Sequence, residues 1–404
     1  MVFFWMVMAV LALECLLSLW WLRRLWRHVR HPAWRMMLAA VMAGVALSMA
    51  WFIASRMGWL PKIRALNALG MLWALLAVPF GVIPCLLCWT AWDLAGTLRL
   101  RRKERLGRLA GIQVSDPAPA AAPGGLRWTR RQLLGTGLAA TPLAATYAAA
   151  GVGVSQIWNF RRRRLDVPVT GLPPELEGLR ILHLSDTHVG GFTPSENLRA
   201  IAQAVADEKP ELILFTGDLI DHANRDLPVS IAFCEKLRAI APLFFCEGNH
   251  DRIDDAEFLR AQMRGRGFAW LTDGQCRTLL LRGRRVQVLG ASWSFGARGH
   301  EAAIAQCAAS RETDAFPLLM AHHPDAFDAA AAADFPLMLA GHSHGGQLML
   351  TERLGAGPVA FNYWSGLYRK AGSSLVVSNG IGHWFPLRLN APAEIAVLRL
   401  ARAG

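Results

Sequence analysis

Residues 182–188, LHLSDTH, close a short apolar run with two side chains of the kinds that bind metal ions. The run at 180–184 predicts a buried strand, and residues 185–188 predict the turn where this strand stops. In an open α/β sheet, ligands bind outside the carboxyl ends of the strands, so Asp186 and His188 can converge on one cation. An Asp-x-His pattern alone is a weak indication, because it occurs by chance in many chains.

Polar clusters follow the later apolar runs in the same way. Runs at 211–216, 242–246, 286–291, 317–321 and 337–340 alternate with helical patterns such as 195–208 and 228–240. This alternation predicts an α/β domain that begins near residue 165. The candidate ligands at the ends of the runs are Asp186, His188, Asp218, Asn249, His322, His342 and His344. One histidine at a strand end is usually structural, whereas this repetition favours a site for two divalent cations.

The charge is divided unevenly along the 404 residues. Residues 1–164 carry 21 Lys and Arg against 4 Asp and Glu, whereas residues 165–404 carry 22 against 26. The net charge of +13 is therefore +17 from the first part and −4 from the second. Because a basic face is the usual footprint of nucleic-acid binding, the second part is not expected to bind nucleic acid.

The basic first part is also apolar enough to lie in a membrane. Segments 3–22, 36–55 and 65–94 each have the length that a bilayer core of roughly 30 Å requires. The third contains Pro79 and Pro84 and is expected to be kinked. These three segments make up a transmembrane region, 1–110, which a Pro/Ala/Gly linker at 111–128 separates from a fourth membrane segment at 129–158.

The fourth segment has two interpretations that the sequence leaves open. Arg130 and Arg131 precede a weakly apolar stretch and resemble a twin-arginine export signal, or they form the basic flank of a fourth spanning helix. The loops on their side carry 14 basic residues and those on the other side carry 7, of which Arg161 to Arg164 are four. The positive-inside rule therefore predicts a multi-pass protein of the bacterial inner membrane with its 165–404 domain on the periplasmic side.

Two features within the spans have structural interpretations as well as functional ones. Glu14 lies near the middle of the first span, where a carboxylate often has a function, but no basic partner is visible in the spans. Cys85 and Cys88 have the spacing of a redox or metal pair, but without a second pair they are interpreted as packing residues.

The set of motifs Asp-x-His, Gly-Asp, Gly-Asn-His, a separate His and Gly-His-x-His resembles the calcineurin-like metallophosphoesterase superfamily. The resemblance covers residues 165–404 and is greatest to its bacterial membrane-associated phosphodiesterase branch. It implies a four-layer αββα sandwich, which here follows an all-α transmembrane region of about four helices. It also implies two divalent metal ions (Mn, Fe or Zn) and hydrolysis of a phosphodiester or pyrophosphate by a metal-bound hydroxide.

The resemblance assigns a role to each motif residue. Asp186, His188 and His344 would bind the first metal, Asp218 would bridge both metals, and Asn249, His322 and His342 would bind the second. His322 is preferred to His323 because the family pattern places its ligand directly after the strand, two residues before a proline. His250 would protonate the leaving oxygen and Asp221 would orient its ring, although Asp221 could instead cap a helix.

Other residues bear on the substrate. Protein phosphatases of the superfamily usually carry Arg where this chain has His222, which favours diesters or small monoesters. Arg161 to Arg164 are expected at the lipid headgroups, and the aromatic stretches 361–364 and 384–385 are either an apolar rim beside the site or core residues. A membrane-anchored phosphoesterase with a lipid or envelope-derived substrate is thus expected. The alternatives are an inactive metal-binding scaffold and a nuclease of the same superfamily.

Overall fold

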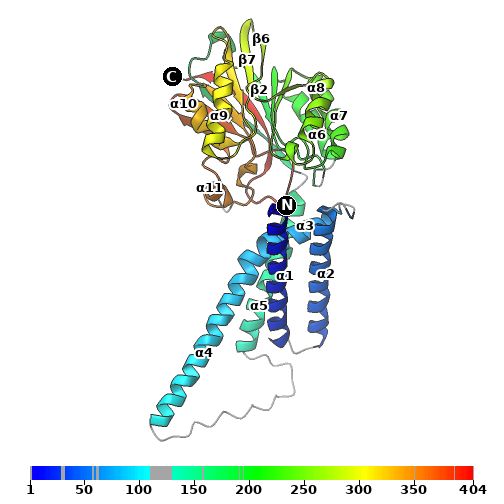
Figure 1. Cartoon of the computed structure of the whole chain (residues 1–404), viewed down its shortest axis with the longest axis vertical. Helices are drawn as coiled ribbons and strands as arrows, with labels where there is room; N and C mark the ends of the chain where they lie inside the picture. The colour runs from blue at the N-terminus through cyan, green and yellow to red at the C-terminus, as the bar shows by residue number, and fades with distance from the viewer. Residues whose placement is uncertain are drawn as a thin grey trace. The chain divides into compact units, whose positions relative to one another are not determined.

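The chain folds into two units, Met1–Gly151 and Val152–Gly404, in the computed structural model (Figure 1). The structure describes residues 2–28, 32–56, 59–60, 63–109, 130–156, 159–190, 192–193, 195–349, 351–385 and 387–403. The predicted linker at 111–128 lies outside the described residues.

The first unit is helical, as its composition predicts. Its elements are α1 (Val2–His28), α2 (Pro32–Arg56), α3 (Arg64–Leu72), the π-helical segment η1 (Trp73–Val82), α4 (Ile83–Leu109) and α5 (Arg130–Gln156). Among the described residues, two helical stretches, Pro32–Ser55 and Leu69–Lys103, are long and apolar enough to cross a membrane. The four predicted crossings themselves remain a prediction.

The interruption expected in the third segment lies at η1. Pro79 sits inside this segment and has no backbone N–H to donate, which is a common reason for a helix to depart from α-helical hydrogen bonding. Trp73, the first residue of η1, is fully buried, and its Nε1 donates to Ser18 Oγ at 3.1 Å. The ring of Trp73 also packs against Trp21, with 6.0 Å between the ring centroids. The π-helical segment η1 is therefore part of the core of the first unit.

The two cysteines of α4 have different surroundings, and only Cys85 is packed as expected. Cys85 is buried and its thiol donates to the carbonyl of Leu138 on α5 at 3.3 Å, whereas Cys88 is exposed. Neither cysteine joins a group of possible metal ligands among the residues that were described. Glu14 is partly buried, and its Oε2 has no hydrogen-bond partner in this part of the structure.

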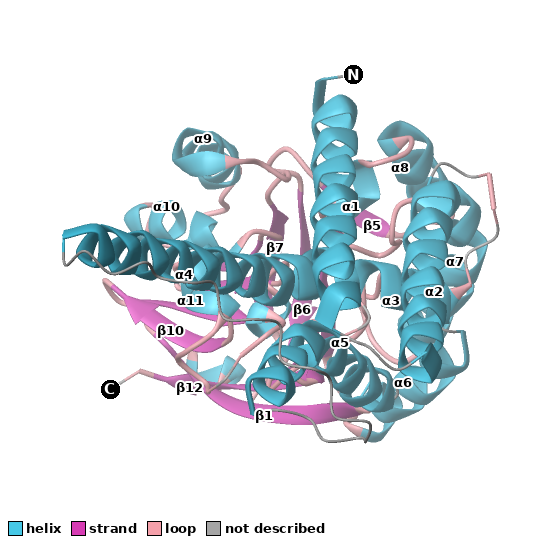
Figure 2. Cartoon of the chain, turned by 90° about the horizontal axis from the view of Figure 1, so that it is seen from below, coloured by secondary structure: helices cyan, strands magenta, loops and turns pink. Residues whose placement is uncertain are grey.

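Twelve strands of the second unit form two six-stranded mixed sheets (Figures 1 and 2). The first sheet contains, in spatial order, β1 (Phe160–Val169), β12 (Ala393–Arg402), β2 (Arg180–Leu184), β3 (Leu212–Thr216), β4 (Leu243–Cys246) and β5 (Ala269–Leu271). The second contains β10 (Gly366–Lys370), β11 (Ser373–Val377), β9 (Leu337–Ala340), β8 (Phe316–Met320), β7 (Arg284–Gly290) and β6 (Cys276–Leu281). Strands β2 to β5 are parallel to one another, and so are β7, β8, β9 and β11. The strands predicted from the apolar runs are thereby confirmed.

The two sheets pack face to face, with helices over their outer faces. Apolar residues of both sheets share one core, which includes Ile181 and Leu214 from the first sheet and Val288 and Leu318 from the second. The outer face of the first sheet packs against α6 (Ser195–Asp207), α7 (Leu227–Arg238) and α8 (Ala256–Gly265). That of the second packs against α9 (Gly296–Ala309) and α10 (Phe327–Ala332). Because the central strands are covered on both faces, they are continuous apolar runs such as LILFT in β3.

The four arginines at 161–164 lie in a strand and pair with acids of the second unit, and their place at the lipid headgroups remains a prediction. They belong to β1, which pairs in parallel with β12, so the second unit's first strand begins before the predicted boundary. Successive side chains of a strand point to opposite faces. Arg161 and Arg163 accordingly lie 2.8 and 3.6 Å from the buried carboxylate of Glu394, while Arg162 and Arg164 pair with acids at the end of α6. These ion pairs attach the edge strand to its own sheet.

Candidate metal centre

The candidate ligands come from the carboxyl ends of five strands in two sheets. Asp186 and His188 follow β2, Asp218 follows β3 and Asn249 follows β4, all in the first sheet. In the second sheet, His322 follows β8, and His342 and His344 follow β9. All seven are brought together because the two sheets face each other, and the structure places every predicted ligand in this one region.

Five of these residues have a left-handed backbone. Positive φ angles of 42° to 69° occur at Asp186, His188, Asp218, His342 and His344. Such angles are uncommon outside glycine, although Asp and His tolerate them better than most residues. Residues held in sparsely populated backbone regions cluster at functional sites, where the surrounding structure holds them. At each of these strand ends, the turn directs a polar side chain to the shared region.

Glycines beside the ligands let the loops approach one another. A Cβ atom at Gly341, which precedes His342, would lie 2.4 Å from Asp186 Oδ2. One at Gly248, which precedes Asn249, would lie 2.1 Å from Asp218 Oδ1. Real Cβ atoms do not approach other atoms so closely, so only glycine fits at these two positions.

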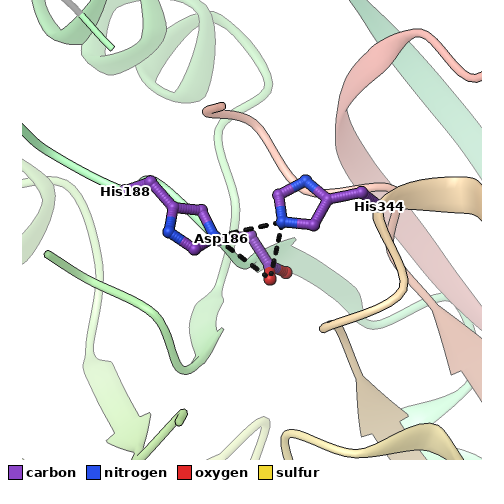
Figure 3. Close-up of side chains that lie close together, drawn as sticks. All are labelled: Asp186, His188 and His344. Atoms are coloured by element: carbon purple, nitrogen blue, oxygen red, sulfur yellow. Dashed lines mark hydrogen bonds and ion pairs between the residues drawn. The ribbon is translucent and has the colours of Figure 1, made fainter. Parts of the chain in front are cut away.

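Asp186, His188 and His344 form the first ligand group (Figure 3). His188 Nε2 and His344 Nε2 are 3.0 Å apart, and Asp186 Oδ1 lies 3.7 and 3.4 Å from them. All three side chains are buried. Three ligand atoms that converge from two sheets form one corner of a cation site.

Asp218, His322 and His342 form the second group. Asp218 also contacts the first group, because its Oδ2 lies 3.1 Å from His322 Nε2 and 3.5 Å from His188 Nε2. Its other oxygen, Oδ1, accepts a hydrogen bond from the backbone N–H of His250 at 2.8 Å. A single carboxylate oxygen therefore lies between the two groups, where a bridging ligand would have to be.

The donor set fits divalent cations. Asn249 Oδ1 is buried and has no hydrogen-bond partner among the described residues. An amide carbonyl oxygen is a good ligand for such ions, so a cation would satisfy this atom. Burial lowers the pKa of His342 to about 3 and that of His344 well below its usual range, so both rings are neutral, as metal ligands must be. Burial also opposes protonation of His322, but the carboxylates of Asp218 and Asp186 outweigh it and raise the pKa of His322 to about 9. The two carboxylates thus favour positive charge at this place, and a cation bound there would displace the proton of His322.

His250 and Asp221 lie next to the first group. The His250 ring packs edge-on against His188, with 4.5 Å between the ring centroids, and its Nδ1 contacts the backbone carbonyl of Asp221. Asp221 Oδ1 lies 3.6 Å from the same Nδ1, while Oδ2 pairs with His222 Nδ1 at 2.8 Å. Burial opposes the protonation of His250, but Asp218 and Asp221 outweigh it and raise the pKa of His250 to about 9. Its geometry suits a proton donor that Asp221 orients.

Asp251 is a supporting residue that the sequence analysis missed. Its buried carboxylate accepts hydrogen bonds from the backbone N–H groups of Asp218, Leu219 and Gly248, at 2.8 to 2.9 Å. It thus joins the loops that follow β3 and β4, which carry Asp218 and Asn249. In the sequence, its position directly after the Gly-Asn-His motif could have indicated this role.

Arg388 is a second supporting residue, for which the sequence offered no signal. Its guanidinium is buried and donates to the carbonyls of Asn379 at 2.7 Å and Gly382 at 2.8 Å. Nη2 also lies 2.9 Å from His344 Nδ1. This one side chain therefore holds the loop after β11 against the ligand that follows β9.

Aromatic side chains surround the second group. Trp293 packs against His322, His323 and His342, with ring centroids 4.9 to 5.5 Å apart. Phe361 lies 5.5 Å from His342, whereas Phe385 is buried, so the expectation of a rim at 384–385 is wrong for Phe385. His323 packs against His342, with 4.8 Å between the ring centroids, and no described group of possible ligands includes it.

A site of this kind, at the strand ends of paired mixed sheets, defines a metal-dependent phosphoesterase. The family profile described as calcineurin-like phosphoesterase matches residues 179–346. The chain is 30% identical over 237 residues to "Phosphodiesterase YaeI" of Escherichia coli strain K12, covering 55% of this chain and 82% of that protein. It is 28% identical over 287 residues to "Uncharacterized metallophosphoesterase YkuE" of Bacillus subtilis strain 168, covering 68% and 98%.

A vertebrate relative is also similar. "Transmembrane protein with metallophosphoesterase domain" of Danio rerio is 27% identical over 252 residues, which covers 59% of this chain and 57% of that protein. Together with the fold and the site, these similarities show that the chain belongs to the calcineurin-like metallophosphoesterase superfamily.

Metal content distinguishes the two neighbouring histidines. We expect the wild-type chain, purified with manganese, to hold about two ions, in line with dinuclear phosphoesterase sites. His322→Ala should lose about one ion because a ligand of the second group is removed. His323→Ala, the matched control, should keep both. Inductively coupled plasma mass spectrometry measures the ratio, and equal losses in the two variants would contradict the assignment of His322.

Proposed function

We propose that this chain is a membrane-anchored hydrolase of phosphodiester or pyrophosphate bonds that uses two divalent cations. The observation that carries the proposal is the position of Asp218 Oδ2 between the two ligand groups, 3.5 Å from His188 and 3.1 Å from His322. The similarity to a protein named as a phosphodiesterase supports the choice of diesters. Asp186, His188, His344 and Asp218 would hold one cation, and Asp218, Asn249, His322 and His342 the other.

The chemistry divides between the cations and the protein. Two bound cations supply an activated water and neutralise the charge that develops on the phosphoryl oxygens. His250 holds a proton beside the first group, and Asp221 keeps its ring in place. The oxygen of water would form the new bond to phosphorus and release one proton to solvent, and the bond to the leaving oxygen would break. His250 would give the leaving oxygen its proton and regain one from solvent. A diester yields an alcohol and a phosphomonoester, and a pyrophosphate yields two phosphates.

A lipid substrate is supported by apolar side chains near the site. Phe295 is 78% exposed and packs on Trp293, with 5.3 Å between the rings. Leu354 and Val359 are exposed in the segment that leads to Phe361, which contacts His342. Exposed apolar groups beside a polar centre are typical of surfaces that contact lipid or another protein. A matched pair of vesicle-borne and water-soluble diesters separates a lipid substrate from a soluble one.

Removing the bridging carboxylate should abolish activity. Asp218→Asn is expected to lower the hydrolysis of bis(4-nitrophenyl) phosphate at least about a thousandfold, because the cations and the activated water depend on it together. Glu175→Ala, which removes an exposed carboxylate ahead of β2, should retain full activity. A variant Asp218→Asn with a tenth of the wild-type rate would sink the assignment, and a wild type without turnover would favour an inactive scaffold.

His250 should matter most for poor leaving groups. His250→Gln is expected to keep both cations and to slow hydrolysis of an alkyl diester by about 10²–10⁴, because an alkoxide needs a proton to leave. The loss should be much smaller with a 4-nitrophenyl ester, whose leaving group is stable as an anion. If cation content fell as steeply as activity, His250 would instead be a ligand.

The side of the membrane is open to a direct test. The count of 14 basic loop residues against 7 supports a periplasmic second unit, with Arg130 and Arg131 in the cytoplasm. Alkaline phosphatase fused after Gly404 should therefore be active in intact cells, whereas a fusion after Leu109 should be inactive. The reverse pattern would place the second unit in the cytoplasm.

A further inference from the structure

A cavity lies beside the metal centre, and the ring of His323 lies between the two. It has a volume of about 240 Å³ and is formed by the start of α9, the loop after β8, α10 and Asn362. His323 lines it and packs against His342 of the second ligand group, with 4.8 Å between the tilted rings. His300 packs against His323 at the same distance. Since one water occupies about 30 Å³ in the liquid, the cavity has room for a group of several heavy atoms.

The lining offers both hydrogen-bond donors and acceptors, with acceptors in excess. Nδ1 of His323 accepts from the backbone N–H of Asp325 at 3.2 Å, so its proton is on Nε2 and this atom is a donor. The amide nitrogen of Asn362 donates to Asp325 at 3.2 Å, which leaves the amide oxygen as an acceptor. Glu301 adds an exposed carboxylate. Phe295 and Phe361 flank His323, with ring centroids 6.4 and 6.0 Å away.

This lining disfavours anionic groups. The carboxylates of Glu301, Asp325 and Asp328 would repel a second phosphate. Two of them are already occupied, because Asp325 accepts from Asn362, and Asp328 accepts from Tyr363 at 2.7 Å and pairs with Lys370 at 2.8 Å. An ammonium group would find Glu301 at the exposed edge and Asp325 as counter-ions, so the ammonium substrate in the test below decides between an amino alcohol and a polyol. Neutral hydroxyl groups, which both donate and accept, match the lining best.

The cavity and the proton donor adjoin different ligand groups. His250 packs on His188 of the first group, whereas the cavity adjoins His342 of the second group through His323. The oxygen that leaves has to be near His250 to receive its proton. A substituent in the cavity is therefore the one that stays on phosphorus.

We propose that this cavity binds a hydroxylated alcohol, such as a glycerol or sugar group, that remains esterified to the phosphate after hydrolysis. The proposal rests on the proposed diesterase function and defines its substrate class. The substrate is a diester of a polyol, and the product is the polyol phosphomonoester. The other alcohol leaves on the side of His250, next to the first ligand group.

The test uses the full chain, loaded with manganese in detergent micelles, and two matched pairs of substrates. The soluble pair is glyceryl 4-nitrophenyl phosphate and methyl 4-nitrophenyl phosphate. The vesicle pair is phosphatidylglycerol and phosphatidylmethanol, with phosphatidylethanolamine as the ammonium arm. The wild type should prefer the glyceryl member by about tenfold or more in kcat/KM, because a site that hydrogen-bonds hydroxyl groups discriminates against analogues that lack them.

Variants of the lining connect this preference to the cavity. Asn362→Ala and Glu301→Ala should each lower the glyceryl-to-methyl ratio severalfold, and Glu175→Ala, the control at the other end of the sheets, should leave it unchanged. The affinity for glycerol phosphate, measured by calorimetry against methyl phosphate, should fall in the same two variants. That readout is independent of turnover.

The products give a second, qualitative readout. Phosphatidylglycerol should yield diacylglycerol and glycerol phosphate. Phosphatidic acid with free glycerol would overturn the proposal, as would a glyceryl-to-methyl ratio near one or a preference for phosphatidylethanolamine. Turnover of the soluble pair alone would support the cavity and assign it to a free polyol diester. No turnover of any substrate would count against the diesterase function itself.

Discussion

The metal centre depends on the face-to-face packing of the two sheets. Asp186, His188, Asp218 and Asn249 follow strands of one sheet, and His322, His342 and His344 follow strands of the other. The apolar core between the sheets, with residues such as Leu214 and Leu318, fixes the distance at which these strand ends meet. Neither sheet alone contributes a complete group, because the first group needs His344 and the second needs Asp218. The free energy of burying the apolar core therefore holds together polar ligand side chains whose burial is unfavourable by itself.

The polar centre costs stability, and the surrounding structure offsets that cost. Residues in sparsely populated backbone regions cost on the order of 1–3 kcal/mol each, less for Asp and His, and five candidate ligands are of this kind. Asp251 and Arg388 compensate by binding several backbone groups of the ligand loops at once. The ligands are thus held in position by hydrogen bonds to two buried side chains, of which the guanidinium of Arg388 makes the stronger, charge-assisted kind.

The edge strand is connected to this centre through one buried acid. Arg161 pairs with Oε2 of Glu394 and Arg163 with Oε1, and Oε1 also accepts from the backbone N–H of Asn379 at 3.1 Å. The loop that begins at Asn379 contacts Asp186, since the backbone N–H of Gly382 donates to the carbonyl of Asp186 at 2.8 Å. A strand that follows the helices of the first unit in sequence therefore contributes to the support of a metal ligand. This gives the arginines a structural role within the second unit.

The sequence by itself determined the strands, the helices between them and the residue types at the strand ends, because these depend on local apolar patterns and on turns. The resemblance carried by the same motifs supplied the family and the candidate ligands. The tertiary structure decided what local patterns do not contain. Contacts between residues distant in the chain put Asp218 Oδ2 between His188 and His322, leave His323 outside both groups and bury Phe385. The cavity beside His323 likewise forms only where α9, α10 and the loop after β8 meet. The spacing of residues in the sequence does not predict that these elements are neighbours.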